Sequence, residues 1–273
     1  MEESYHKQGS LYTYMRCSAL LPRRKTLLFI HGIGDSSLSY LPFLNTPLLT
    51  DYNLLIPDLL GYGKSAMNDD CCFSLQVALL IQHIQFLEKQ KNISFSDLIL
   101  VAHSMGSIHA MQLCHSSIKD QIKAVVSIEG SITQYGSFVS ESVTKVIKQG
   151  DFDEWFKKFK EIIVFQGLIK KYPVLRDYYA SLKFCYPPAF LQNALEMREV
   201  SLSEQGAYTN LSGQLFLKLK LPKIYCYGDK SLCEESVGFL KKFKLPTQVF
   251  STDSHFVMLI CFDEFVTFLK DWL

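Results

Sequence analysis

The sequence predicts an α/β protein in which helices flank a mostly parallel central sheet. Apolar runs of strand length recur along the chain and end at Gly, Pro, Asp or Ser, with helical patterns between them. Because the runs are continuously apolar rather than alternating, we expect strands that are buried on both faces, as in parallel sheets. The predicted strands are Thr26–His31, Asn53–Pro57, Asp97–Ala102, Ile122–Ile128, Pro222–Tyr227 and Thr247–Ser251.

Helical spacing of apolar residues predicts the segments between these strands. Val77, Leu80 and Ile84 show the spacing clearly, and so do the apolar residues of the stretch 265–272 at the carboxyl end. Strands that alternate with helices in this way form a parallel sheet wrapped by helices.

The stretch 131–212 breaks the alternation. It is rich in Phe, Tyr and Trp and has helical character, but it contains no convincing strand before the sheet pattern resumes at Pro222. An ordinary crossover between two strands does not need so many residues. We therefore predict a helical cap over 131–212, inserted into a core formed by 1–130 and 213–273.

Composition limits the classes of function. The 273 residues carry 28 Lys and Arg against 27 Asp and Glu, a net charge of +1, which gives no electrostatic footprint for nucleic acid or an anionic membrane surface. The eight cysteines contain no C-x-x-C pair, which is typical of a reducing compartment. With no signal sequence and no run of about 18 apolar residues, we expect a cytoplasmic protein without a membrane span.

The passage D-L-I-L-V-A-H-S-M-G-S, residues 97–107, places Ser104 between a predicted buried strand and a helix. This is the layout of a nucleophile elbow, a tight turn that presents a serine hydroxyl at the edge of a sheet. The turn needs small residues two positions before and after the serine, and Ala102 and Gly106 stand there. We predict that Ser104 is a nucleophile, although the five-residue motif alone also arises by chance.

A second passage, L-L-F-I-H-G-I-G-D, residues 27–35, ends a buried strand with His31 and Gly32. Serine attack on a carbonyl carbon needs two backbone N–H donors that point at the oxygen as it becomes negative. We expect Met105, directly after the nucleophile, to supply one donor. We expect Ile33 to supply the other, because the glycines let this loop approach a substrate. The alternative is a glycine-rich turn that only joins a strand to a helix.

A third passage, I-P-D-L-L-G-Y-G-K-S, residues 56–65, follows the next predicted strand. Together the three passages resemble the α/β-hydrolase family, in which H-G, D-x-x-G-x-G-x-S and the serine elbow occur in this order. The resemblance implies an α/β-hydrolase fold over nearly the whole chain. It says much less about the substrate, because this fold hosts many chemistries.

A serine hydroxyl is a good nucleophile only when a base removes its proton, so a histidine is expected downstream of Ser104. His255 stands in S-T-D-S-H-F, between the last predicted strand and the last helix, where the family places its catalytic histidine. We predict His255 as the base. The other histidines belong to the oxyanion loop (His31), the position beside the nucleophile (His103), helical segments (His83, His109, His115) and an amino-terminal tail (His6).

The acid that orients the histidine departs from the common family pattern. The family usually carries it in a turn G-x-x-D after the cap, and here that turn reads Y-G-D-K-S, with Ser231 in the acid's place. Two candidates remain: Glu129, where some family members such as haloalkane dehalogenases have a glutamate, and Asp229, directly after Gly228. We favour Glu129, because a carboxylate at the end of a buried strand is costly unless it is paired. The sequence leaves both open.

These residues imply hydrolysis of an ester, thioester, lactone or related acyl bond, with Ser104 attacking and His255 moving the proton. A serine here excludes the dehalogenases and epoxide hydrolases of the fold, which need an aspartate nucleophile. The aromatic cap favours a small apolar or aromatic acyl substrate. We expect no metal or organic cofactor and no nucleic-acid partner, and the sequence leaves the oligomeric state open.

Two rival functions use the same residues differently. One is hydrolysis of a C–C bond, or acyl transfer to an acceptor other than water, with the same three side chains. The other is a ligand-binding protein that keeps the fold without catalysis, which Ser231 in the acid's place leaves open. A strained serine turn argues against this second rival, because a binding pocket does not need one.

Overall fold

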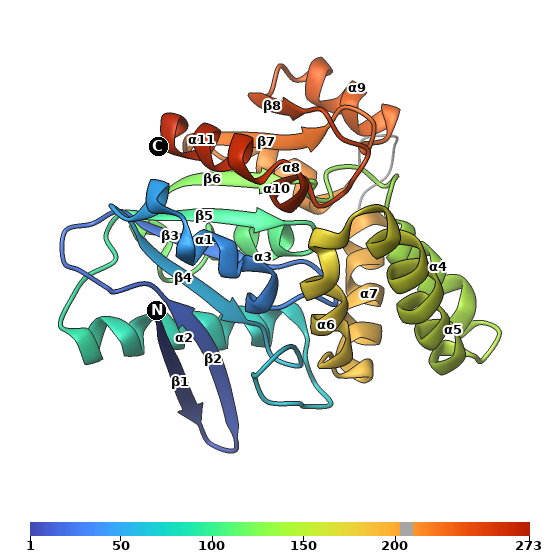
Figure 1. Ribbon diagram of the computed structural model, residues 1–273, viewed down its shortest axis with the longest axis horizontal. Helices are drawn as coiled ribbons and strands as arrows, with labels where there is room; N and C mark the ends of the chain where they lie inside the picture. The colour runs from blue at the N-terminus through green and yellow to red at the C-terminus, as the bar shows by residue number, and fades with distance from the viewer. Residues whose placement is uncertain (203–209) are drawn as a thin grey trace.

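A computed structural model of the chain describes residues 1–202 and 210–273 (Figure 1). Within these residues, strands form one sheet in the order β1-β2-β4-β3-β5-β6-β7-β8. The six predicted strands are confirmed to within one residue at each end, and they pair in parallel with one another. The strands are β1 Glu2–Gln8, β2 Leu11–Cys17, β3 Thr26–Ile30, β4 Asn53–Asp58, β5 Leu98–His103, β6 Ile122–Ile128, β7 Lys223–Gly228 and β8 Thr247–Phe250.

An antiparallel hairpin, β1 and β2, extends the sheet at its amino-terminal edge. The prediction that His6 lies in an amino-terminal tail is wrong: His6 lies in β1, where its ring contacts those of His83 and Phe86. Most side chains of β1 are exposed, so this strand lacks the apolar run by which the others were predicted.

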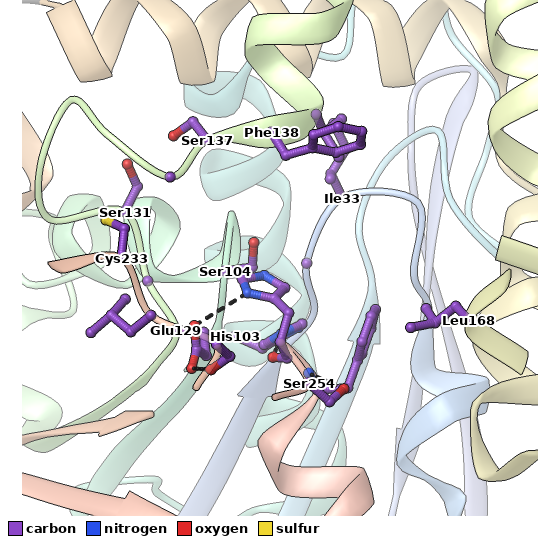
Figure 2. Close-up of a pocket in the computed structure, with 18 of the residues that line it drawn as sticks. Ile33, His103, Ser104, Glu129, Ser131, Ser137, Phe138, Leu168, Cys233 and Ser254 are labelled. Carbon is purple, nitrogen blue, oxygen red and sulfur yellow. Dashed lines mark hydrogen bonds and ion pairs between the residues drawn. The ribbon is translucent and has the colours of Figure 1, made fainter. Parts of the chain in front are cut away.

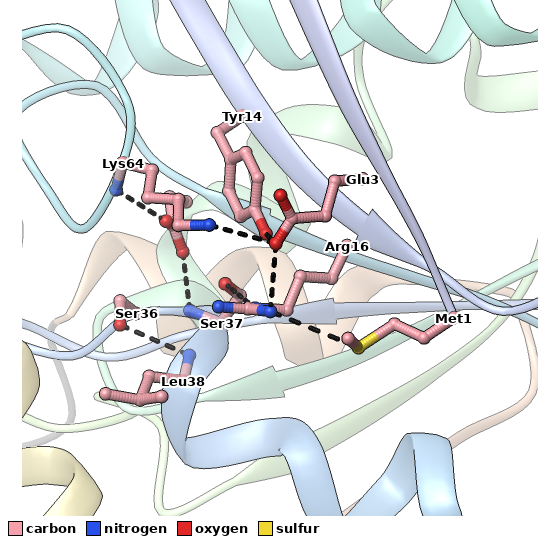
Figure 3. Close-up of polar contacts among 9 residues, drawn as sticks. Met1, Glu3, Tyr14, Arg16, Ser36, Ser37, Leu38 and Lys64 are labelled. Atoms are coloured by element: carbon pink, nitrogen blue, oxygen red, sulfur yellow. Dashed lines mark hydrogen bonds and ion pairs between the residues drawn. The ribbon is translucent and has the colours of Figure 1, made fainter.

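One glutamate ties the hairpin to the rest of the sheet (Figure 3). Glu3 Oε1 accepts hydrogen bonds from Tyr14 Oη at 2.6 Å and from Lys64 Nζ at 2.9 Å, and Arg16 Nη1 lies 3.3 Å away. Arg16 Nε also donates to Ser37 Oγ at 3.0 Å. These contacts join the hairpin to the loops that follow β3 and β4.

Helices cover both faces of the sheet (Figure 1). In this view α1 and α11 lie in front of the sheet, and α2 and α3 lie behind it. The predicted helical stretches 77–84 and 265–272 fall in α2 and α11. These helices are α1 Leu41–Asn45, α2 Phe73–Lys91, α3 Gly106–Leu113, α8 Leu211–Lys218, α9 Glu234–Lys242, α10 Val257–Ile260 and α11 Phe262–Trp272, with short 3₁₀ turns η1 Ser37–Tyr40, η2 Pro47–Leu49 and η3 Lys119–Gln121.

The strand order reverses direction between β3 and β5. From β3 the chain passes to β4 on one side, whereas β5 lies on the other side and β6 continues outward from it. In open parallel sheets, ligands bind in the crevice outside the carboxyl ends of the strands at such a switch point. The loops that begin with His31 and Ser104 leave β3 and β5 at this crevice.

The described residues between β6 and β7 are helical or irregular and include no strand. Helices α4, α5, α6 and α7 gather beyond the carboxyl ends of the strands (Figure 1). Around Phe190, the rings of Phe152, Trp155, Phe156 and Phe159 form an interior of their own. The elements are α4 Phe138–Ile147, α5 Phe152–Lys158, the π-helix η4 Phe159–Ile169, η5 Pro173–Leu175, α6 Arg176–Lys183 and α7 Pro187–Leu202.

Residues 203–209 of the predicted cap lie outside the described residues. None of the helices in the described part of the chain is both long and apolar enough to cross a bilayer.

Candidate active site

Ser104 lies on a tight turn between β5 and α3, as predicted. Its backbone has φ of 51°, in the left-handed region that a residue with a side chain seldom adopts. The turn is held at both ends, because Ser104 N donates to Ile128 O at 2.9 Å and Ser107 N donates to Ser104 O at 3.0 Å. A Cβ on Gly106 would lie 2.3 Å from Ile30 O, so only glycine fits there. The fold therefore fixes the serine at the end of the strand.

His255 lies in the loop between β8 and α10, and its side chain is 46% exposed. Its Nδ1 lies 3.4 Å from Oε2 of Glu129, whose side chain is only 3% exposed. A dashed line at Glu129 marks this ion pair in Figure 2. The structure thus brings together Glu129 and His255, which are far apart in the sequence.

Ser104 and His255 line the same cavity, but no described hydrogen bond joins their side chains. Such contacts are often long in the absence of substrate and shorten when it binds. In the described part of the chain, His255 Nε2 has no hydrogen-bond partner, so this nitrogen is available to a hydroxyl proton.

Glu129 is buried but well supplied with partners. Its Oε1 accepts hydrogen bonds from Gly228 N at 2.8 Å and from the hydroxyl of Ser231, while Oε2 faces His255. A buried carboxylate is tolerated when its oxygens are paired and hydrogen-bonded in this way. Ser231, which occupies the usual place of the acid, therefore supports the glutamate that reaches the histidine instead.

Asp229 lies in a different environment. It is exposed, and its Oδ1 accepts a hydrogen bond from Thr252 N at 3.0 Å. In the described residues, no ion pair joins it to His255. The carboxylate caps the turn that follows β8, so the structure does not bring this candidate to the histidine.

The two predicted backbone donors flank Ser104. Among the described hydrogen bonds outside helices and strands, none uses the N–H of Ile33 or of Met105. The loop of Ile33 approaches the serine closely, since a Cβ on Gly32 would lie 3.2 Å from Ser104 Cβ. Tyr178 Oη contacts Ile33 O at 3.4 Å and helps to hold this loop. Two free amides beside a serine are suited to binding a negatively charged oxygen.

His103 makes contacts with the His255 loop that were not predicted from the sequence. Its ring centroid lies 4.8 Å from that of His255, and its Nε2 lies 3.0 Å from His255 O. Burial holds the pKa of His103 well below its ordinary value, so the ring is neutral and Nε2 donates to the carbonyl oxygen. His103 thus supports the backbone of the loop that carries His255. No local sequence pattern predicts a contact between two residues that lie 152 positions apart.

A cavity of about 790 Å³ opens in front of these residues. Its lining includes Ser104, Glu129 and His255 on the sheet side. Apolar side chains line the opposite side, and Figure 2 shows Phe138 and Leu168 among them. A mostly apolar cavity with a few convergent polar groups is the usual form of a small-molecule site.

Comparison with known proteins agrees with this geometry. The family model for the alpha/beta hydrolase fold matches residues 25–162, a little over half of the chain. The chain belongs to the α/β-hydrolase-fold family. The matched segment includes both the loop of Ile33 and the turn of Ser104.

Curated relatives match only part of the chain. The Arabidopsis thaliana protein called "Probable lysophospholipase BODYGUARD 1" is 32% identical over 96 residues, which cover 33% of this chain and 19% of that protein. A protein from Caballeronia sordidicola called "Epoxide hydrolase" is 28% identical over 127 residues, 46% of this chain and 37% of that protein. The matches thus span about a fifth and about two fifths of these relatives' lengths.

Solved structures of the α/β-hydrolase fold match nearly the whole chain. A hydrolase from Pseudomonas aeruginosa superimposes with a TM-score of 0.73 at 14% identity, covering 99% of this chain and 97% of that one. A thermophilic esterase from Thermogutta terrifontis gives 0.72 at 14% identity, covering 100% and 98%. At this identity the likeness shows the fold alone.

Proposed function

We propose that this chain is a serine hydrolase that cleaves a carboxylic ester or related acyl bond through an acyl-enzyme on Ser104. The observation that carries the proposal is the buried Glu129 at 3.4 Å from His255, beside a serine whose backbone has φ of 51°. Strained backbone persists only where the surrounding structure enforces it, and it gathers at functional sites. A site that only binds a ligand needs neither feature.

The proposed reaction has two stages, formation and hydrolysis of the acyl-enzyme, and the same groups act in both. His255 takes the proton of Ser104 as the serine oxygen attacks the carbonyl carbon, and Glu129 stabilises the imidazolium that forms. The N–H groups of Ile33 and Met105 bind the oxygen of the tetrahedral intermediate. His255 then protonates the leaving group, and a water that it deprotonates releases the acid from Ser104.

The choice of Glu129 over Asp229 as the acid rests on their surroundings. Glu129 is buried and contacts His255, whereas Asp229 is exposed and accepts a hydrogen bond from Thr252 N. In a catalytic triad the acid orients the histidine ring through Nδ1, and Nδ1 is the atom that Glu129 approaches. Ser231 and Gly228 keep the second oxygen of this carboxylate engaged.

The apolar cavity supports an acyl substrate with a sizeable apolar part. We propose that residues 131–212 act as a cap, since α4 and η4 supply much of the lining opposite Ser104. All eight cysteines are unpaired, which supports a reducing, cytoplasmic location. The near-zero net charge supports a small-molecule substrate rather than a nucleic acid.

Epoxide hydrolysis, the activity in the name of one relative, fits these residues less well. In this fold that reaction needs a carboxylate nucleophile that forms an alkyl ester, and the turn after β5 carries Ser104 instead. Hydrolysis of a C–C bond or acyl transfer would use the same three side chains, and product analysis separates them from ester hydrolysis.

A fluorophosphonate probe tests the nucleophile. We expect covalent labelling of the peptide that contains Ser104, identified by mass spectrometry, and no labelling of Ser104→Ala. The matched control is Ser107→Ala, three positions along in α3. A folded wild-type protein that resists the probe would favour the ligand-binding alternative.

A pair of isosteric substitutions tests the acid. We expect Glu129→Gln to lower kcat on a short p-nitrophenyl ester by at least about 100-fold, because the ring of His255 loses the charge that orients it. Asp229→Asn should leave kcat within about twofold. The opposite ranking would transfer the role to Asp229.

A further inference from the structure

The π-helix η4, Phe159–Ile169, exposes more apolar surface than a helix of its composition normally does. Only Phe159 and Val164 of its eleven residues are buried. Ile162 is 53% exposed, Ile163 44% and Phe165 49%. A helix that is apolar around most of its circumference is normally covered by other protein or by lipid. Among the described residues, the ring of Tyr179 contacts that of Phe165, and about half of each of these three side chains stays exposed.

The exposed face lies at the mouth of the cavity that contains Ser104. Ile163 lines this cavity, and so does Phe138, which is 57% exposed at the start of α4. Figure 2 shows Phe138 and Ile33 on one side of the cavity above Ser104. We call the group Phe138, Ile162, Ile163 and Phe165 the mouth surface. It joins exposed apolar side chains directly to the lining of the proposed active site.

Lysines stand at both ends of η4. Lys157 and Lys158 precede it, and Lys170 and Lys171 follow it, all four exposed. Lys158 pairs with Glu154 and Lys171 pairs with Asp253. Within the part of the chain that the structure describes, Lys157 and Lys170 form no ion pair, although Lys157 is near enough to Glu154 to attract it electrostatically. The net charge of +1 is an average over the chain and does not reveal this local arrangement.

Apolar side chains flanked by lysines match the cross-section of a lipid leaflet. In helices that lie in the membrane interface, the apolar residues enter the boundary between headgroups and acyl chains, and the lysine ammonium groups stay at the level of the headgroups. Anionic headgroups add an attraction for each lysine near the surface. A second copy of the chain is a poorer cover, because a symmetric contact through this face brings the same lysines close together.

We propose that the mouth surface docks on an anionic lipid bilayer. Docking would turn the opening of the cavity toward the lipid. If the proposed ester hydrolysis is correct, the substrate class is then an acyl ester that resides in a bilayer and enters by its apolar part. The docking itself does not depend on the chemistry at Ser104.

Vesicle flotation of the chain tests the docking. We expect the wild type to float with vesicles that contain phosphatidylglycerol, less with pure phosphatidylcholine, and less at high salt. The double variant Ile162→Ser/Phe165→Ser should bind the anionic vesicles more than about tenfold more weakly. Lys157→Gln/Lys170→Gln should lose most of the preference for the anionic lipid.

The matched control is Met67→Ser/Val249→Ser, which removes two side chains exposed by 62% and 42% that do not line the cavity. Its binding should equal that of the wild type. Absence of flotation with anionic vesicles, or equal flotation of the Ile162→Ser/Phe165→Ser variant, would overturn the proposal. So would a concentration-dependent dimer that the same variant dissolves, because a second copy would then be the cover.

The fluorophosphonate reaction in vesicle-free solution separates this result from the proposed function. If the probe labels Ser104 but the protein does not float with vesicles, the serine nucleophile is supported and the membrane docking is overturned. If the protein floats but the probe does not label it, the docking is supported and the serine nucleophile is overturned.

Discussion

The turn around Ser104 and the helix η4 border the same cavity from opposite sides, and they differ in how tightly their residues are packed. The turn is tightly packed: its backbone is held by hydrogen bonds, and a Cβ added to its glycine would meet a neighbouring backbone oxygen. Helix η4 has only two buried side chains, and most of its other side chains are partly or fully exposed.

This difference separates two tasks. Positions of reacting atoms must be fixed within fractions of an ångström, so the residues that hold them are over-determined by packing. In the proposed function, recognition of an apolar acyl group needs apolar area rather than exact directions, so the surface that supplies it tolerates more change. Substitutions on the two sides should therefore differ sharply in their cost.

The largest effect is expected at Gly106. In Gly106→Ala the new Cβ meets Ile30 O at 2.3 Å, and this oxygen belongs to a central strand that cannot move aside. We expect a loss of more than about 4 kcal/mol in the free energy of unfolding, or no folded protein at all. Urea unfolding followed by circular dichroism measures it. A loss below about 1 kcal/mol would show that the turn is softer than its geometry indicates.

The aromatic interior around Phe190 should be almost as sensitive to substitution as the core around the sheet. Phe190 is fully buried, and its ring contacts those of Trp155, Phe156 and Phe159. We expect Phe190→Ala to cost about 3 to 4 kcal/mol, whereas Ile162→Ser on the exposed side of η4 should cost less than about 0.5 kcal/mol. Equal costs would mean that η4 is covered in solution.

Buried histidines make the stability of the core depend on pH. Burial lowers the pKa of His109 from 6.5 to about 4. Below pH 6.5 the unfolded chain therefore binds a proton that the folded chain does not, and the free energy of unfolding falls as pH falls toward 4. His31 adds a fall of the same sign, whereas burial raises the pKa of Asp35 to about 7 and opposes both between pH 3.8 and 7.

Comparison with His109→Gln isolates one of these protons. The variant should lose stability less steeply on acidification, by up to about 1.4 kcal/mol per pH unit. Urea unfolding of both proteins at a series of pH values measures the difference in slope. Parallel curves would show that His109 keeps an ordinary pKa in the folded state.

Local sequence was sufficient for one part of the fold and site and insufficient for another. The central strands were predictable because burial on both faces leaves continuous apolar runs, and Ser104 because its turn needs Ala102 and Gly106. The hairpin β1–β2 was not predicted because its outer strand, β1, has no apolar run. Polar contacts such as that between Tyr14 and Glu3 hold this strand instead.

The support of the candidate acid was also beyond the sequence. The hydrogen bond between Ser231 and Glu129 joins residues 102 positions apart, and the contact of His103 with the His255 loop spans 152 positions. Spacing rules describe turns and single helices or strands. They do not say which of two carboxylates, Glu129 or Asp229, lies at the end of the strand nearest the histidine.

Ser231 should have a moderate effect on catalysis and little on folding. Ser231→Ala removes one of two donors to Glu129 Oε1 and leaves Gly228 N in place. We expect kcat to fall about tenfold, equivalent to about 1.4 kcal/mol, with a smaller change in KM, because this hydroxyl is engaged by Glu129 Oε1 and Gly228 O. The pH profile of kcat should shift as well, since the histidine is paired with this carboxylate. An unchanged kcat and pH profile would reduce Ser231 to a packing role.

The smallest effect is expected at Gly167, the counterpart of Gly106 on the opposite side of the cavity. A Cβ there would have only Ile162 O as a near neighbour, at 3.4 Å, an ordinary contact. Gly167→Ala should therefore leave the fold intact and stabilise it by about 0.5 to 1 kcal/mol, because alanine loses less backbone entropy in a helix. An added methyl group would thus stabilise the protein at Gly167 and strongly destabilise it at Gly106. A loss above about 1 kcal/mol in Gly167→Ala, measured beside Gly106→Ala in urea, would mean that η4 is as tightly constrained as the serine turn.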